Sequence, residues 1–350
     1  MATNITETVP TGAIRYNTDS NKMECFNGTK WYQISVSSPN LGNTGDYSAA
    51  ARGFHVGGRK SPGYAYEDQI DAYNIASTGS VFDFGDMTTG GSNNYEQGAF
   101  ASSIRACAFG GRPSNTYTNT IEFITMSSTG NSQNFGDLTA PTVFPSGVSN
   151  GTRGVRLGGI SPGSAPNLGR NTMDYVTIAS TGDAQDFGDL LDTPALTSAC
   201  ASHTRGCLMG GGAPDPSYNT NRIQYITIAS LGNANDFGDM VANTTYNAAA
   251  SNSVRGISSG NGANPTSRLD MITIATLGNS IDFGTSTVTR SASTASSSPV
   301  RMVVAGGYSS NYDATMDYVS FDTGGQAIDF GDLSASNAYT CGFSNAHGGL

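Results

Sequence analysis

Two recurring patterns in this chain have residue types and spacing that could do chemistry. An Asp-Phe-Gly-like triplet occurs six times, and in phosphoryl-transfer enzymes such a triplet holds a magnesium ion. An arginine also recurs at a fixed place, and a ring of arginines could bind an anion. Three histidines, His55, His203 and His347, add candidate general bases or metal ligands.

The surrounding sequence supports none of these reactions. A phosphoryl-transfer site needs its triplet once, beside a Gly-rich loop, a strand lysine and a His-Arg-Asp loop. A metal centre needs three or more converging ligands, whereas the histidines stand at unlike places in the repeat. No EF-hand spacing marks a calcium site, and nothing supports a Ser-His-Asp set. We expect no catalytic residue, no metal and no cofactor, and leave open a calcium ion at an Asp-rich turn.

The triplets belong to a longer repeat, of which DYVTIASTGDAQDFGDL from Asp174 is typical. The central phenylalanines are separated by 46 to 52 residues, which indicates an array of similar structural units. We expect each phenylalanine to pack in the core between units. These residues are Phe84, Phe135, Phe187, Phe237, Phe283 and Phe330.

A second phrase, an apolar run closing on glycine, precedes each triplet. The repeated arginine stands five residues before the first glycine of a pair, or before Gly260 in the one degenerate copy. These arginines either line a channel as anion ligands or lock units together by pairing with aspartates, and we favour the structural role. The arginines are Arg52, Arg105, Arg153, Arg205, Arg255 and Arg301. The candidate partners are Asp83, Asp186, Asp236, Asp282 and Asp329.

Each repeat predicts four short strands, because apolar and polar residues alternate and glycine-containing turns separate the runs. Six such units predict an all-β protein, a six-bladed β-propeller of four-stranded antiparallel blades. The first unit has little room for its own first strand. The segment from Asn337 looks like a first strand and the start of a second. We expect this C-terminal strand to complete the first blade and close the ring.

The arrangement resembles the kelch family over roughly residues 45–350. The shared features are a Gly-Gly ending the second strand, an aromatic-rich third strand and a large aromatic on the fourth. Kelch repeats usually place tryptophan there, whereas this chain places phenylalanine. The TIASTG…DFGDL repeats and the NAHGGL ending also resemble structural and tail-fibre proteins of marine bacteriophages.

Residues 10–35 depart from the repeat and predict a three-stranded meander. The segment resembles a small hairpin module of phage tail fibres. The matching residues are Thr11, Gly12, Ile14, Arg15, Tyr16, Asn17, Met23, Glu24, Asn27, Gly28 and Trp31. A module this small cannot bury its own core, so we expect it to attach to other virion proteins and to form a homo-oligomer, most simply a trimer. A plain N-terminal cap is the alternative. We divide the chain into this module (1–37), a linker (38–46) and the propeller (47–350).

Composition argues against two classes of partner. The net charge is −10 with no run of Lys or Arg, so we expect no nucleic-acid binding. No apolar stretch is long enough to span a bilayer, and we expect neither membrane insertion nor a secretion signal. The five cysteines are odd in number and are interpreted as small apolar strand residues in a reducing compartment.

The loops between second and third strands differ in every unit and are rich in Tyr, Asn, Ser, Pro and Gly. This composition suits recognition, although ordinary solvated loops are the alternative. The ligand would be a bacterial surface glycan or protein. The candidate binding residues are Tyr64, Tyr66, Tyr117, Tyr218, Tyr308 and Tyr312.

The sequence therefore favours a non-enzymatic virion structural protein, a tail fibre or capsid-associated fibre assembled in the host cytoplasm. One alternative is a propeller enzyme of the oxidase or lyase type, which would need clustered His, Tyr and Cys at the channel mouth. Another is a cellular kelch-like interaction scaffold, in which the N-terminal module has no evident role. The virion hypothesis rests on resemblance, because a fold of this kind hosts many functions.

Overall fold

The computed structural model describes residues 9–17, 22–33, 51–60, 65–88, 96–113, 116–163, 169–212, 219–262 and 265–350. The described residues form an all-β structure, and none of them forms a helix long and apolar enough to cross a membrane. The chain divides into two compact units, Met1–Thr44 and Gly45–Leu350. This division falls within the predicted linker, which itself lies outside the described residues.

The first unit contains one antiparallel sheet, in the order β1 (Ile14–Asn17), β2 (Lys22–Phe26) and β3 (Trp31–Gln33). This is the meander that the sequence predicts. Trp31 packs against Phe26 with 5.3 Å between ring centroids, and the guanidinium of Arg15 lies 4.2 Å from the Trp31 ring centroid. Ile14, Tyr16 and Tyr32 remain exposed, so the sheet presents apolar side chains to its surroundings.

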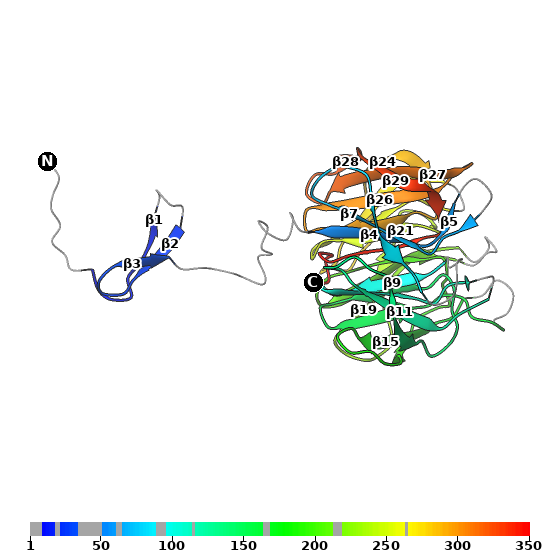
Figure 1. Cartoon of the computed structure of the whole chain (residues 1–350), viewed down its shortest axis with the longest axis horizontal. Coiled ribbons are helices and arrows are strands. Elements are labelled where there is room, and N and C mark those ends of the chain that lie inside the picture. Colours follow the sequence, from blue (N-terminus) through cyan, green and yellow to red (C-terminus); the bar gives the residue numbers. More distant parts are fainter. Residues whose placement is uncertain are drawn as a thin grey trace. The chain divides into compact units, whose positions relative to one another are not determined.

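The second unit contains six small sheets in its described residues (Figure 1). Each has four antiparallel strands at its centre, an arrangement compatible with a β-propeller. The innermost strands are β9 (Gly98–Ala101), β13 (Ser146–Ser149), β17 (Ser198–Ala201), β21 (Ala248–Ser251), β25 (Thr294–Ser297) and β30 (Cys341–Ser344). The second strands are β10 (Arg105–Phe109), β14 (Arg153–Leu157), β18 (Arg205–Gly211), β22 (Arg255–Ser259), β26 (Arg301–Tyr308) and β4 (Arg52–Val56).

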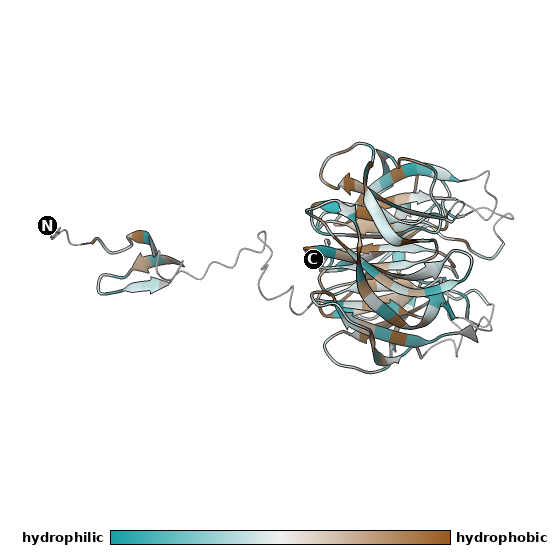
Figure 2. Cartoon of the chain, turned by 90° about the horizontal axis from the view of Figure 1, so that it is seen from above, coloured by the Kyte–Doolittle hydropathy of each residue, from teal (hydrophilic) through white to brown (hydrophobic). Residues whose placement is uncertain are grey.

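The two outer positions of each sheet carry the remaining repeat phrase. The third strands are β11 (Thr120–Thr125), β15 (Thr172–Thr177), β19 (Thr220–Thr227), β23 (Thr266–Thr273), β27 (Tyr312–Ser320) and β7 (Gln69–Asn74). The fourth strands are β12 (Gln133–Asp137), β16 (Gln185–Asp189), β20 (Asn235–Asp239), β24 (Ile281–Arg290), β29 (Ile328–Ala338) and β8 (Phe82–Asp86). Short strands β5 (Arg59–Lys60), β6 (Ala65–Tyr66) and β28 (Gly325–Gln326) extend two sheets. Hydrophobic and hydrophilic residues are interspersed along the strands (Figure 2).

The last strand of the chain completes the first sheet. β30 pairs antiparallel with β4, with Cys341 opposite Val56 and Ser344 opposite Gly53. Each innermost strand also lies beside its successor, and β30 lies beside both β25 and β9. The sequence predicts the start of a second strand in the segment from Asn337, but the residues after β30 form turns. The reason is contact with the inner strands, since the amide of Gly348 donates to the Ser251 carbonyl at 2.9 Å.

The repeated Phe-Gly pair joins neighbouring sheets. Five of the six phenylalanines are buried and Phe283 is partly buried. The glycine lies at a β-bulge, as Gly136 does opposite Ile121, and has a φ of 149°. A Cβ on Gly136 would lie 2.4 Å from the Gly182 carbonyl oxygen in the next sheet, so glycine is required by close approach of two backbones.

The repeated arginines also join sheets, but not through the aspartates. In five of the six, Nη1 donates to a main-chain carbonyl of the following sheet, as Arg153 does to Ile228 at 2.9 Å. The guanidinium of Arg153 lies 4.6 Å from the Tyr175 ring centroid, and Arg301 is stacked similarly on Tyr318. The arginines bond main-chain carbonyls and not the predicted aspartates, because the aspartates of the triplets lie on the outer strands. None of these arginines lines the central cavity, so they do not form a ring of anion ligands there.

Candidate functional site

The innermost strands surround a central cavity of about 70 Å³. Their side chains are mostly Ala, Ser and Gly, as in SACA of β17 and AAAS of β21, because larger residues would collide where these strands lie side by side. The residues that immediately precede the six strands all line one cavity, so the six strands run in the same direction. Their first residues therefore lie at one end and their last residues at the other.

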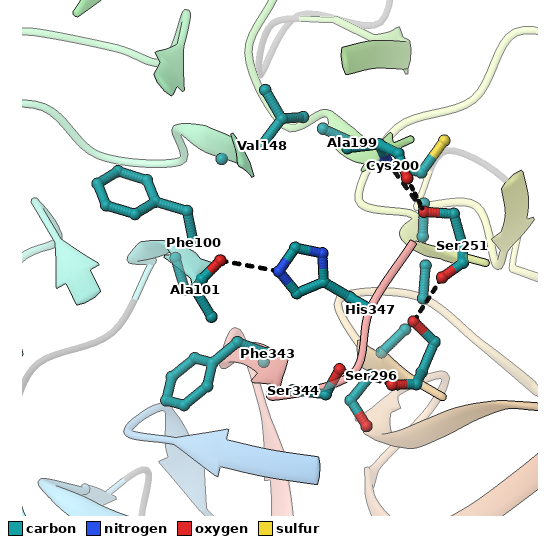
Figure 3. A pocket seen from close by; sticks show the side chains of 18 of the residues that line it. Phe100, Ala101, Val148, Ala199, Cys200, Ser251, Ser296, Phe343, Ser344 and His347 are labelled. Atoms are coloured by element: carbon teal, nitrogen blue, oxygen red, sulfur yellow. Dashed lines mark hydrogen bonds between the residues drawn. The ribbon is translucent and has the colours of Figure 1, made fainter. Parts of the chain in front are cut away.

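The tail-side end, where the innermost strands finish, is occupied by residues 345–350 of the chain. His347 points into the centre of the strand ring and its Nε2 lies 2.8 Å from the Ala101 carbonyl oxygen (Figure 3). The amide of Gly349 donates to Nδ1 of the same ring at 3.1 Å. Nδ1 is therefore the acceptor, and the proton of the neutral ring is on Nε2.

This geometry requires a neutral His347. Burial lowers the pKa of its imidazole, an effect that the Ala101 carbonyl partly opposes. A proton on Nδ1 would face the Gly349 amide, so the charged form cannot keep both hydrogen bonds. The tail-side end is thus a filled, hydrogen-bonded plug.

The loop-side mouth is the opposite end of the cavity, defined by the residue pair before each innermost strand. It encloses a second cavity of about 80 Å³. The lining residues are Glu96, Gln97, Phe144, Pro145, Leu196, Thr197, Tyr246, Asn247, Ala292, Ser293, Tyr339 and Thr340.

The first residue of every pair has a left-handed backbone. Their φ angles range from 51° at Ala292 to 64° at Glu96, a region that non-glycine residues seldom occupy. Main-chain hydrogen bonds join the pairs in sequence, as from Tyr246 to Leu196 at 2.8 Å and from Ala292 to Tyr246 at 2.7 Å. Strained backbone of this kind is found at functional sites more often than elsewhere. The loop-side mouth is therefore a candidate functional site.

Three aromatic rings and one carboxyl group lie in the lining of the loop-side mouth. Tyr246 makes edge-to-face contacts with Phe144 and Tyr339, at 5.5 and 5.8 Å between centroids. Burial raises the pKa of both tyrosine hydroxyls, which therefore stay protonated. Burial also raises the pKa of Glu96 to about 7, although Arg112 and Arg59 oppose the shift. Glu96 Oε2 lies 3.4 Å from Arg112 Nε.

The structure places half of the predicted tyrosines. Tyr64 and Tyr218 lie outside the described residues, and the side chain of Tyr66 is not described. Tyr117 is half-buried, and its hydroxyl lies 3.3 Å from Arg112 Nη2. Tyr308 and Tyr312 face each other across the β26–β27 hairpin, with 5.5 Å between ring centroids.

These tyrosines connect to the mouth that the sequence did not predict. Arg112 contacts both Tyr117 and Glu96, so the loop after β10 reaches the mouth. Tyr308 pairs with Ser291, the residue before Ala292 of the lining, and Tyr312 lies opposite Tyr308. The predicted binding loops and the left-handed ring therefore share one end of the unit.

Sequence reasoning missed the mouth because its residue types do not repeat. Glu, Phe, Leu, Tyr, Ala and Tyr share no side-chain property. The sequence marks these positions only by their constant distance from the repeated arginine. Glu96 stands nine residues before Arg105, and Phe144 stands nine before Arg153. A fixed backbone position with variable side chains is typical of a recognition surface on a rigid scaffold.

The mouth offers aromatic faces, hydroxyls, two side-chain amides and one carboxyl group, a set suited to holding a polar ligand. Among the described residues, no three His, Cys, Asp or Glu side chains lie close enough to hold a metal ion. No protein-family model matches this chain, and a search of curated proteins finds no significant match. The functional argument for this site therefore rests on its geometry.

Proposed function

We propose that the six sheets are the blades of a closed six-bladed propeller. The pairing of β30 with β4 supports closure, because it joins the two ends of the second unit in one sheet. The contact of β30 with β9 supports it as well. A closed ring leaves no unpaired inner edge, and it would hold the loop-side mouth rigid.

We further propose that this propeller binds the surface of a bacterial host as part of a virion fibre and catalyses no reaction. One observation carries the binding proposal: the three predicted tyrosines whose side chains are described, Tyr117, Tyr308 and Tyr312, lie at the same end of the unit as the loop-side mouth and its cavity. The ligand class is a surface glycan or protein. The virion assignment is supported by the resemblance of the repeats and of the N-terminal segment to phage proteins.

The N-terminal unit is proposed to anchor the fibre and to assemble it as a trimer with itself or with other virion proteins. Support comes from its three-stranded sheet, which leaves Ile14, Tyr16 and Tyr32 exposed. So small a sheet is only marginally stable alone, and a partner surface would cover these side chains.

Light scattering on the full chain and on a variant lacking residues 1–37 tests the fibre proposal. We expect the full chain at three times the 36.1 kDa chain mass and the truncated chain as a monomer. A control in which Thr29 is replaced by Ser keeps the sheet and its exposed apolar residues, and should remain a trimer. A full-length monomer would contradict the proposed assembly role.

A further inference from the structure

The loop-side mouth contains buried oxygen atoms that lack partners. Asn247 Oδ1, Ser293 Oγ and Thr340 Oγ1 make no hydrogen bond among the described residues. Asn247 and Ser293 are more than nine-tenths buried, with 6% and 7% of their surface exposed. Leaving such an atom unsatisfied costs about 1–3 kcal/mol, so three around one cavity indicate a missing hydrogen-bonding group.

The orientation of Asn247 shows what that group must be. Its Nδ2 donates to Ser198 Oγ at 2.6 Å and to Ser258 Oγ at 2.7 Å. Nδ2 also lies 3.4 Å from the Met209 carbonyl oxygen, which can only accept, so Nδ2 keeps its side of the amide and Oδ1 remains an acceptor at the cavity. The missing group must therefore supply a donor to Asn247, and the hydroxyls of Ser293 and Thr340 can donate or accept.

The aromatic residues supply a platform beside these atoms. Tyr246 is held by Phe144 and Tyr339 through interplanar angles of 87° and 81°. Its ring is therefore fixed before any ligand arrives, which reduces the entropy lost on binding. A rigid aromatic ring next to unpartnered polar atoms suits a molecule that has both C–H and O–H groups on its surface.

Charge at the mouth argues against a metal ion as that molecule. Oxygen ligands attract hard cations, but Arg112 and Arg59 both act on Glu96. With Arg112 Nε 3.4 Å from its Oε2, the carboxyl group is already neutralised. An uncharged, hydroxyl-bearing ligand fits this balance better than a divalent cation.

We propose that the loop-side mouth binds one saccharide unit of a bacterial surface glycan. This inference rests on the proposed function and names its ligand class. A sugar hydroxyl donates to Asn247 Oδ1, others bond Ser293 and Thr340, and a C–H face packs on Tyr246. Tyr308, which pairs with Ser291 next to the lining residue Ala292, and Tyr312 opposite it extend the surface along which the next units of the glycan lie.

Saturation-transfer NMR on the full chain tests the proposal with four probes: the methyl glycosides of glucose, galactose, mannose and N-acetylglucosamine. The test variant carries Ser293→Ala and Thr340→Val. Neither hydroxyl has a hydrogen bond within the described structure, so we expect folding to be retained, as checked by thermal unfolding. The control Ser251→Ala removes a buried hydroxyl at the tail-side end, where Ser251 Oγ donates to the Ala201 carbonyl.

We expect at least one glycoside to bind the wild type and the control, with affinity reduced about tenfold or more in the double variant, as loss of two hydrogen bonds implies. Absence of transfer from all four probes overturns the proposal. Undiminished transfer in the double variant overturns it too, as does stabilisation of the wild type by calcium chloride without glycoside binding. If the protein instead binds bacterial surfaces through its loop tyrosines and the double variant binds equally well, this inference fails while the proposed function stands.

Discussion

The amide of Gly130 donates a hydrogen bond to the carbonyl of Phe84 at 2.8 Å, although the two residues belong to different sheets. The same bond joins Gly182 to Phe135 and Gly232 to Phe187. The turn between third and fourth strands of one sheet therefore rests on the Phe-Gly pair of the sheet before it. The short, nearly identical turns of the repeat are explained by this contact.

The glycine contact predicts unequal effects of one substitution at two glycines. Gly136 and Gly182 have similar φ angles, 149° and 153°, but a Cβ meets the Gly182 carbonyl only in the first case. We expect Gly136→Ala to lower the free energy of unfolding by about 1–3 kcal/mol more than Gly182→Ala, because of overpacking. Urea unfolding measures both. Equal losses would mean that backbone strain alone, and not the sheet contact, selects glycine.

A buried ion pair gives a second prediction. Arg156 Nη2 lies 2.7 Å from Asp174 Oδ2, and both side chains are almost fully buried. We expect Arg156→Met to cost about 3–5 kcal/mol, since Asp174 is left as an unpaired buried charge. The matched control is Arg222→Met, whose pair with Asp192 is partly exposed, at 42% and 33% of the two side chains, and whose loss should cost under about 1 kcal/mol. Chemical unfolding measures the free energy of unfolding of both variants. Similar losses would contradict the claim that burial makes the Arg156–Asp174 pair the more costly one to break.

The pKa of Glu96 predicts a pH-dependent stability. A folded-state value of about 7, above the usual 4.5, means that the folded protein binds the proton more tightly. Stability therefore falls as pH rises from about 4.5 to 7. We expect Glu96→Gln to raise the free energy of unfolding at pH 8 by about 1–3 kcal/mol and to change it little at pH 4.5. A difference that is the same at both pH values would contradict this account.

The left-handed ring predicts opposite effects of one substitution at two alanines. Ala292 has a φ of 51°, whereas Ala295 lies within β25. We expect Ala292→Gly to stabilise the protein by about 0.5–1 kcal/mol, because glycine adopts positive φ without strain. Ala295→Gly should destabilise it by a similar amount. Differential scanning calorimetry resolves the sign, and destabilisation by both would argue that the backbone at Ala292 is unstrained.

How far the sequence could anticipate these features depends on whether side-chain type recurs. The Phe, Gly and Arg of the repeat are constant, so strands, turns and the joining of β30 to β4 followed from pattern alone. The partner of Arg153 did not, because the Ile228 carbonyl belongs to the backbone and leaves no residue type to read. The loop-side mouth could not be predicted from the sequence for the same reason. It is defined by the left-handed backbone of Glu96, Phe144 and the equivalent residues, and not by a recurring residue type.

The buried polar residue within each third strand is an intermediate case, predictable in part from the sequence. Asp174 accepts from the Thr139 hydroxyl at 2.7 Å, and Gln224 accepts from the Leu191 amide at 2.7 Å. The position recurs in the sequence as Asp, Glu or Gln, but its link to the preceding sheet requires the fold. Long-range partners of this kind are set by packing and not by local propensity.

Binding of the full chain to an array of bacterial surface glycans and outer-membrane proteins tests the central claim most directly. The loop variant is Tyr308→Ser with Tyr312→Ser. The matched control, Leu231→Ser with Leu277→Ser, changes exposed apolar residues in the turns at the other end. The account predicts that wild type and control bind at least one array component and that the loop variant binds about tenfold or more weakly. Binding to no component, or loss in the control with retention in the loop variant, would contradict it.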